Sequence, residues 1–337
     1  MQALSNSPIQ AHNSSDTPKL GLICITAGDE VRYRTVTRKR LLSLSTAEQE
    51  RTLRDLYAEN LRRLHKALEF CHRENIFLYR LSSNLFPFSD EAIGRTVLDE
   101  FTETMHEIGE KSRRFSIRLT LHPDQFVVLN SDKPEVIENS RKILQTQAGW
   151  LDRFDLPRSQ FAPMNIHGGK SDRSERLVNV IQTLPDNIRQ RLTLENDEYA
   201  YSATEIAEIC LKTGVAMCFD AHHHVIHEKL ESYDDPRVAE MVALARTTWQ
   251  DPDWQLVHIS NGKTAFHDPE HSDLIEKMPG AFRQVPWIDI EAKAKERAIA
   301  LLEREWLGRS ENSPAMDTND KKKRPTRSRS GKTSKRP

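Results

Sequence analysis

The feature that most constrains the fold is the alternation of short, β-rich apolar runs with amphipathic helical stretches along residues 19–308. This order is typical of a parallel sheet with helical crossovers. Eight runs are predicted as strands: 20–26, 76–81, 116–121, 161–167, 191–195, 216–220, 255–259 and 286–291. Eight such units favour one closed (β/α)8 TIM barrel, for which roughly 250 residues is typical. A doubly wound open sheet is the main competitor, but no G-x-G-x-x-G follows the first run.

Helical periodicity fills the segments between these runs. The clearest case has apolar residues on one face from Leu53 to Cys71, and Ser45 and Glu48 before it form a predicted capping box. The other predicted helices are 89–108, 132–151, 174–184, 203–211, 235–245, a weak segment at 273–277, and 292–302.

The composition excludes several classes of protein. No apolar run approaches the roughly 18 residues of a membrane span, and residues 1–18 lack the apolar stretch of a secretory signal. The four cysteines have no close paired spacing, which argues against a disulfide framework or a zinc ribbon. We therefore expect a disordered segment at 1–18 and a soluble protein of a reducing compartment, cytoplasmic and nucleoid-associated in a bacterium or nuclear in a eukaryote.

A low-complexity tail, predicted at 309–337, carries a strong positive charge. Residues 321–337 hold nine Lys or Arg and no acid, although the whole chain has a formal net charge of −1, so residues 1–320 have a net charge of −10. A basic tail on an acidic body suggests attachment to a polyanion such as nucleic acid. A solvated tail that only aids solubility is the equally open alternative.

Polar residues stand where the predicted strands end. Active sites of TIM barrels lie at the carboxyl ends of the strands, so these residues are expected to share one rim. Six consecutive strands end at or contain a His or a carboxylate, and two further histidines follow: His122, His167, Glu195, Asp220, His258 and Glu291, then His223 and His271.

Any one of these residues alone is more typical of a cap or a satisfied polar group. Six in phase would form a costly buried ring without a compensating cation, which favours a metal cluster. Mixed imidazole and carboxylate ligands suit Zn²⁺, Mn²⁺ or Fe²⁺, and the number of ligands implies two or three ions. Adjacent ions of this kind are characteristic of phosphoester cleavage.

Ordered motifs across residues 19–305 resemble the UV damage endonucleases of bacteria and fungi. The motifs are LGLICIT, VRYRTVT, YRLSSNLFPF, RLTLHPDQFVVLNS, NIHGGKSDR, LTLENDE, CFDAHHH, VHISNG with the later HSD, and IDIEAKAKE. That family belongs with endonuclease IV and the xylose-isomerase-like barrels. Its members nick DNA immediately 5′ of cyclobutane pyrimidine dimers and 6-4 photoproducts, and some also act at abasic sites.

The resemblance implies how the ligands are shared. One ion would be held by His122, His167 and Glu195; a second by Glu195 with Asp220, His271 and Glu291; and a third by His223 and His258. Leu256 stands where relatives have a further ligand, so the third site is expected to be weaker, completed by water or empty. The resemblance favours Mn²⁺, with Zn²⁺ or Mg²⁺ as alternatives.

The resemblance also assigns residues to DNA. Gln125 and Phe126 would form a probe loop that fills the gap left by extruded nucleotides, although Phe126 also suits a core position. Loop residues placed to meet the DNA backbone are Arg32, Tyr33, Arg34, Asn84 and Lys170. Solvated loop charge and loop capping are the plain alternatives for these residues.

The expected activity is hydrolysis of a phosphodiester in UV-damaged double-stranded DNA by a monomer, leaving a 3′-hydroxyl and a 5′-phosphate. Ions would lower the pKa of the attacking water and neutralise the leaving oxygen. A sugar isomerase of the same superfamily and a non-cleaving damaged-DNA-binding protein are the alternatives, and fold alone does not separate them. The Gln125–Phe126 loop and the tail favour DNA, and the ligand set favours cleavage.

Deleting residues 321–337 should weaken DNA binding and flatten its dependence on salt, because fewer counterions are released when fewer cations meet phosphates. The affinity of full-length and shortened protein for one duplex, measured over a series of salt concentrations, checks this. An unchanged slope would assign the tail to solubility alone.

Overall fold

Eight parallel strands close into a barrel in sequence order, which confirms the predicted TIM barrel. The structure is a computed structural model that describes residues 17–124 and 126–309. The strands are β1 (Lys19–Ile23), β2 (Leu78–Leu81), β3 (Arg118–Leu121), β4 (Met164–His167), β5 (Leu192–Glu195), β6 (Ala216–Asp220), β7 (Leu256–Ile259) and β8 (Trp287–Ile290). Strand β1 pairs with β8 in parallel, so the sheet has no free edge among these strands.

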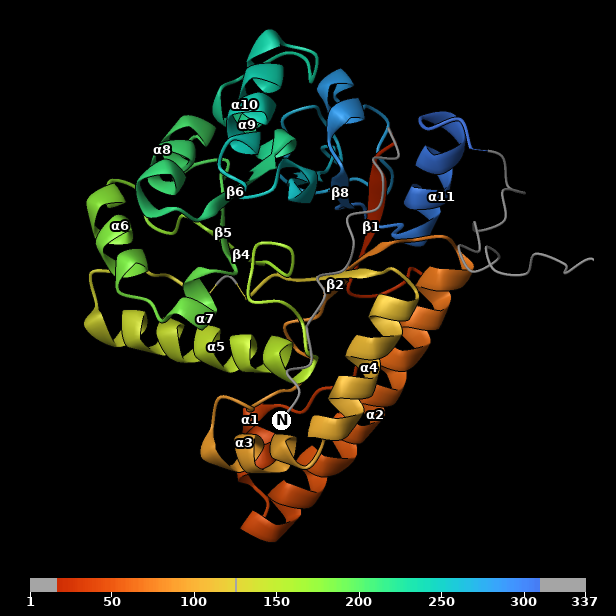
Figure 1. The fold of residues 1–337 in the computed structure, drawn as a ribbon, viewed down its shortest axis with the longest axis vertical. Coiled ribbons are helices and arrows are strands. Elements are labelled where there is room, and N and C mark those ends of the chain that lie inside the picture. The colour runs from red at the N-terminus through yellow and green to blue at the C-terminus, as the bar shows by residue number, and fades with distance from the viewer. Residues whose placement is uncertain (1–16, 125, 310–337) are drawn as a thin grey trace, which may run out of the picture.

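Helices cover the outside of the barrel (Figure 1). They are α1 (Arg38–Leu42), α2 (Thr46–Arg73), α3 (Ala92–Asp99), α4 (Thr102–Arg114), α5 (Pro134–Arg153), α6 (Ser174–Gln182), α7 (Asp186–Arg189), α8 (Ala203–Thr213), α9 (Ala221–His227), α10 (Pro236–Arg246) and α11 (Glu296–Glu305), with 3₁₀ turns η1 (Pro252–Trp254) and η2 (Gly280–Gln284). The long helix α2 lies beside α4. The predicted capping box is confirmed, since Glu48 accepts hydrogen bonds from the amide and the hydroxyl of Ser45.

Two helix predictions are wrong. The segment 89–108 contains two helices, because the amides of Glu100 and Phe101 bond to carbonyls three residues back and end α3. The segment 273–277 is not helical. There the side-chain oxygen of Asn261 accepts from the amides of Glu276 and Lys277, both at 2.9 Å, so those amides are not available for helical bonds.

Packed side chains close the base of the barrel. Leu256, two residues before His258, is buried there with Leu78 and Trp287. The guanidinium of Arg118 sits among aromatic rings and donates to three backbone carbonyls, those of Phe161, Trp254 and Gln160 at 2.7 to 3.0 Å. The interior of the barrel is therefore filled at this end, and its polar residues open only toward the carboxyl ends of the strands.

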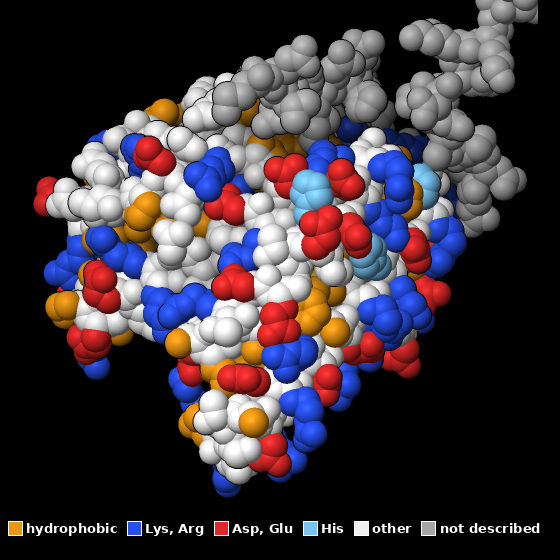
Figure 2. All heavy atoms as spheres, turned by 60° about the horizontal axis from the view of Figure 1, so that its bottom comes forward, with side chains coloured by type: hydrophobic (Ala, Val, Ile, Leu, Met, Phe, Trp, Pro, Cys, Tyr) orange, Lys and Arg blue, Asp and Glu red, His pale blue; other side chains and the backbone are white. Residues whose placement is uncertain are grey.

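The surface of the body mixes charges of both signs. On the face drawn in Figure 2, acidic and basic side chains are interspersed. Ion pairs such as Arg54 with Glu100 and Lys111 with Glu69 join neighbouring helices on the outside. The described residues on this face form no continuous cationic patch. No helix within 17–124 and 126–309 has the length and apolar character to cross a membrane.

Candidate metal centre and DNA-facing rim

A cleft of about 580 Å³ opens at the carboxyl ends of the strands. Most of the predicted ligands line it, and the remaining two, Asp220 and His258, are buried in the barrel interior. The ligands that line the cleft are His122, His167, Glu195, His223, His271 and Glu291.

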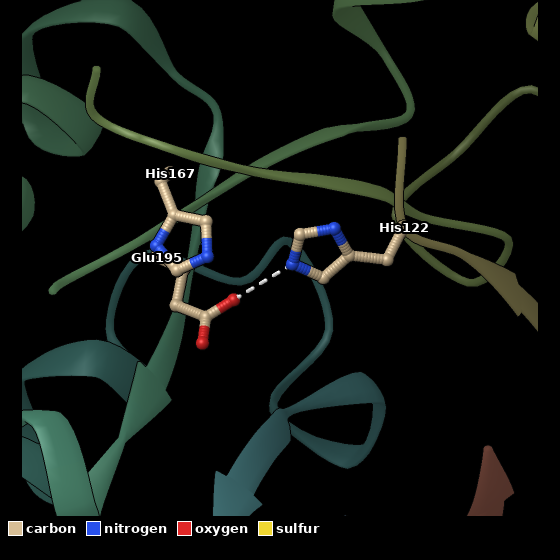
Figure 3. Close-up of side chains that lie close together, drawn as sticks. All are labelled: His122, His167 and Glu195. Carbon is tan, nitrogen blue, oxygen red and sulfur yellow. Dashed lines mark hydrogen bonds and ion pairs between the residues drawn. The ribbon is translucent and has the colours of Figure 1, made fainter. Parts of the chain in front are cut away.

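The first ligand group joins three neighbouring strands. His122 follows β3, while His167 and Glu195 are the last residues of β4 and β5, and their side chains converge (Figure 3). His122 Nε2 lies 3.2 Å from Glu195 Oε2. Asn165 also donates to Glu195 Oε2 and accepts from the hydroxyl of Thr193 at 2.8 Å. This chain of hydrogen bonds fixes the orientation of the Glu195 carboxylate.

Two more groups continue from the first, because Glu195 belongs to the first and second groups and Asp220 to the second and third. Glu195, Asp220 and His223 form one, and Asp220, His258 and Glu291 form the other; within each group the potential ligand atoms lie within 4.8 Å of one another. Asp220 Oδ2 is buried and has no hydrogen-bond partner among the described residues. An orphaned carboxylate oxygen in a cluster of imidazoles fits a divalent ion, because the ion would provide the missing partner.

The grouping differs from the one that the resemblance implies. His258 from β7, rather than His271, lies with Asp220 and Glu291. His271 stands in the following loop, where its Nδ1 is 3.8 Å from Glu291 Oε2. The reason is depth: His258 is a strand residue that points into the barrel and is 1 % exposed, whereas His271 is at the rim.

The histidine-rich segment after β6 is helix α9, and its histidines have separate environments. Asp220 caps the helix by accepting from the His223 amide at 2.8 Å, which brings the His223 ring back toward the carboxylates. The ring of His222 bonds to the Tyr233 hydroxyl at 2.7 Å, and His224 packs against Phe219. Only His223 of these three belongs to a ligand group among the described residues.

The charges of the cluster shift its proton affinities. Burial alone would raise the pKa of Glu195, but His258 and His167 beside it hold that pKa well below its usual range. Burial would lower the pKa of His223, yet Asp220 and Glu195 raise it to about 9. Burial lowers the pKa of His167, which favours the neutral imidazole that a metal ligand requires. The cluster therefore holds ionised carboxylates and attracts cations.

Sequence reasoning missed a lower layer of polar residues inside the barrel. Asn165 and Asp289 lie two residues before His167 and Glu291, on the same side of their strands, and both are buried. The period of two along a strand was a signal that could have found them. Arg80 of β2 reaches the same layer, and Glu198 lines the cleft 3.8 Å from His223 Nε2.

The residues predicted to meet DNA fall into two sets. Phe126 is 70 % exposed and lines the cleft, so it is not a core aromatic. Arg34, Asn84 and Lys170 are also exposed. Gln125 lies outside the described residues.

Arg32 and Tyr33 instead make contacts within the protein. The Arg32 guanidinium donates to the carbonyls of Thr26 and Ala27 in its own loop. The hydroxyl of Tyr33 is 2.7 Å from that of Tyr79, and burial raises the pKa of Tyr33 above its usual range. These side chains shape the loop after β1.

Three rim loops are tied together by Asn130. Its side-chain amide donates to the Lys170 carbonyl at 2.7 Å and to the Tyr201 hydroxyl at 3.0 Å, and its oxygen accepts from the Lys170 amide. The Tyr201 hydroxyl also accepts from the Arg173 amide. The loop that carries Phe126 is therefore braced against the loops after β4 and β5.

Comparisons with known proteins agree with this geometry. The profile of the UV-endonuclease UvdE family matches residues 18–315. A UV DNA damage endonuclease of Nostoc sp. is 56 % identical over 292 residues, covering 86 % of this chain and 91 % of that protein. One of Deinococcus radiodurans is 48 % identical over 288 residues, covering 85 % and 94 %.

Solved structures show the same fold. The crystal structure of SacUVDE superposes with a TM-score of 0.72 at 26 % identity, covering 85 % of this chain and 98 % of that one. Endonuclease IV from Thermus thermophilus superposes with a TM-score of 0.56 at 13 % identity, covering 86 % and 99 %, which shows a shared barrel alone. The extent of the profile match and the identity to the Nostoc protein together place the chain in the UV-endonuclease UvdE family.

Proposed function

We propose that this protein is a DNA repair endonuclease that uses divalent metal ions to nick DNA immediately 5′ of UV photoproducts, leaving a 3′-hydroxyl and a 5′-phosphate. The observation that carries the proposal is the chain of three ligand groups linked by Glu195 and Asp220 at the floor of an open cleft. The names of the two bacterial relatives support the substrate class. Abasic sites belong to the same proposal as further substrates.

Two or three ions, with Mn²⁺ favoured, would be held by His122, His167, Glu195, Asp220, His223, His258 and Glu291, with His271 at the rim. When bound, they would supply an activated water and neutralise charge on the departing 3′ oxygen. Glu195 belongs to two ligand groups, and Asn165 holds its carboxylate in place. The protein itself therefore contributes ligand orientation and a buried floor, with no side-chain nucleophile needed.

Phe126 is proposed to enter the duplex at the lesion, with Gln125 beside it. An exposed ring at the mouth of the cleft can stack where photodimers have weakened base stacking. Arg34, Asn84 and Lys170 are exposed on loops at the same end of the barrel and are proposed to contact the sugar-phosphate backbone. The proposed complex contains one monomer and one damaged duplex.

The strongest test is incision of UV-irradiated plasmid. The protein with Mn²⁺ should convert irradiated but not untreated supercoiled plasmid to nicked circles. Glu195→Gln should reduce nicking by more than about 100-fold, since loss of even a supporting partner of a ligand costs 10–100-fold. Binding of damaged DNA should be retained, because Glu195 lies beneath the DNA-facing loops. Equal nicking by the variant after chelation and repletion with Mn²⁺ would remove Glu195 from the mechanism.

Metal binding should strengthen as the pH rises from about 6.5 toward 9. An ion must displace the proton from His223, whose pKa is raised to about 9, and from His258, whose pKa is also raised, so affinity should rise by up to about tenfold per pH unit for each proton released. In metal-free protein, a rise in pH has the opposite effect, because it lowers the stability of the fold. A raised pKa stabilises the fold fully below the unfolded pKa of 6.5, and this contribution is lost as the pH rises through about 9.

Thermal unfolding at several pH values, with chelator and with Mn²⁺, separates the two effects. The gap between the two melting temperatures should widen with pH. His223→Asn should widen it less, because that variant has no imidazolium to deprotonate. A gap that narrows with pH in the unmodified protein would contradict the role of His223.

Phe126→Ala should weaken binding to irradiated duplex about tenfold or more, because stacking on an aromatic ring contributes roughly 1–3 kcal/mol per base. Leu211→Ala is the matched control, since Leu211 is also an exposed apolar side chain, 57 % exposed, but lies near the end of α8. Affinities for irradiated and intact duplexes of the same sequence check this. An equal effect of both substitutions, or an equal loss for intact DNA, would exclude Phe126 as a lesion probe.

A further inference from the structure

Arg80 is a buried cation inside the candidate metal centre. It lies on β2, is 7 % exposed, and crosses the interior toward β8. Its Nε donates to Asp289 Oδ2 at 2.9 Å, and its Nη2 donates to Glu291 Oε1 at 2.7 Å. The same Nη2 is 3.0 Å from Nε2 of His258. One guanidinium thus contacts two of the three members of the Asp220–His258–Glu291 group.

Asp289 explains why this guanidinium stays in place. Its side chain is fully buried, and it belongs to none of the ligand groups in the described part of the chain. A buried carboxylate without a cation would be strongly destabilising, so Asp289 needs Arg80 whether or not ions are bound. Because the guanidinium is rigid and planar, its hydrogen bond to Asp289 also fixes the positions of the other guanidinium nitrogens.

The contact with Glu291 restricts how that carboxylate can be used. Arg80 occupies Oε1, whereas Oε2 faces His271 at 3.8 Å. Arg80 therefore fixes the orientation of the Glu291 carboxylate, with Oε2 on the side of the rim. The His258 ring is held between the same guanidinium and Glu195, whose Oε1 is 3.1 Å from His258 Nδ1.

We propose that Arg80, anchored by Asp289, is a positioning residue of the metal centre: it fixes Glu291 and His258 for the ion that they share with Asp220. This inference rests on the proposed metal-dependent function. The guanidinium acts through its geometry, because a charge alone would neutralise Asp289 without directing Glu291. Among the described residues, the hydrogen bonds of the Arg80 side chain go to Asp289, His258 and Glu291 and to no member of the His122–His167–Glu195 group.

Arg118 provides a matched control. It is a second buried arginine in the same barrel, but it donates to backbone carbonyls at the closed base rather than to any of the candidate ligands. Arg118→Met should alter stability and leave the affinity for ions within about twofold. Arg80→Met removes charge and donors at similar volume, while Arg80→Lys retains the charge and loses the fork.

The test is stepwise Mn²⁺ titration of each full-length protein, with free Mn²⁺ measured by electron paramagnetic resonance. Arg80→Met should weaken one class of bound ion by about 10–100-fold, the range found for partners that orient metal ligands, and leave another class within about twofold. Arg80→Lys should remain at least about tenfold weaker for that class. Asp289→Asn should weaken the same class, and the double variant should be no weaker than Arg80→Met, because the two residues act as one unit.

Several results would overturn the proposal. These are unchanged affinity in Arg80→Met, full rescue by Arg80→Lys, or an equal loss for every ion. If Arg80→Met does not fold, the same titration is done with Arg80→Lys and Asp289→Asn alone. Unmodified protein that binds no Mn²⁺ would refute the metal centre itself, whereas tight binding by both unmodified protein and the Arg80 variants would refute only the role of Arg80.

Discussion

Repulsion among buried carboxylates is the constraint on which the site depends. Glu195, Asp220 and Asp289 are buried and Glu291 is partly buried, and they approach one another because the parallel strands of a closed barrel end at one rim. In a medium of low dielectric such a group requires compensating positive charge. Arg80 supplies one permanent charge, and raised pKa values at His223 and His258 show the same field acting on the imidazoles. The fold therefore brings together negative charge that favours the binding of divalent cations.

The side chains inside the barrel form three layers between the base and the rim. Apolar residues and Arg118 close the base, where Leu256 packs. The next layer, which includes Asn165 and Asp289, supplies donors and acceptors that orient the groups above. The ligands form the uppermost layer. TIM-barrel interiors are more often filled by branched apolar side chains, so this polar middle layer is a cost to folding that the site above it explains.

The sequence predicted the parts of this structure that depend on local pattern. Period predicted the eight strands, and the polar residues at or shortly after the strand ends include the members of the three groups that the structure brings together as candidate ligands. The pairing of ligands could not be predicted from spacing, because His258 and His271 both follow β6 and differ mainly in depth. Arg80 was missed because its partner Asp289 is 209 residues away and meets it only when β1 pairs with β8 and β2. The break after Asp99 was missed because apolar spacing continues across it.

The two ends of the candidate site differ in how they are held. Apart from His271 in its rim loop, the candidate ligands are on strands, directly after strand ends or on a capped helix, so the closed sheet restricts their separations. Phe126 is on a loop, yet Asn130 and Tyr201 brace that loop against two others. Under the proposal that the Phe126 ring replaces stacked bases, binding would be weaker if the loop had to be ordered first, because that ordering costs conformational entropy. Bracing lowers this cost, and it links the position of the aromatic ring to the same strands that position the metal ligands.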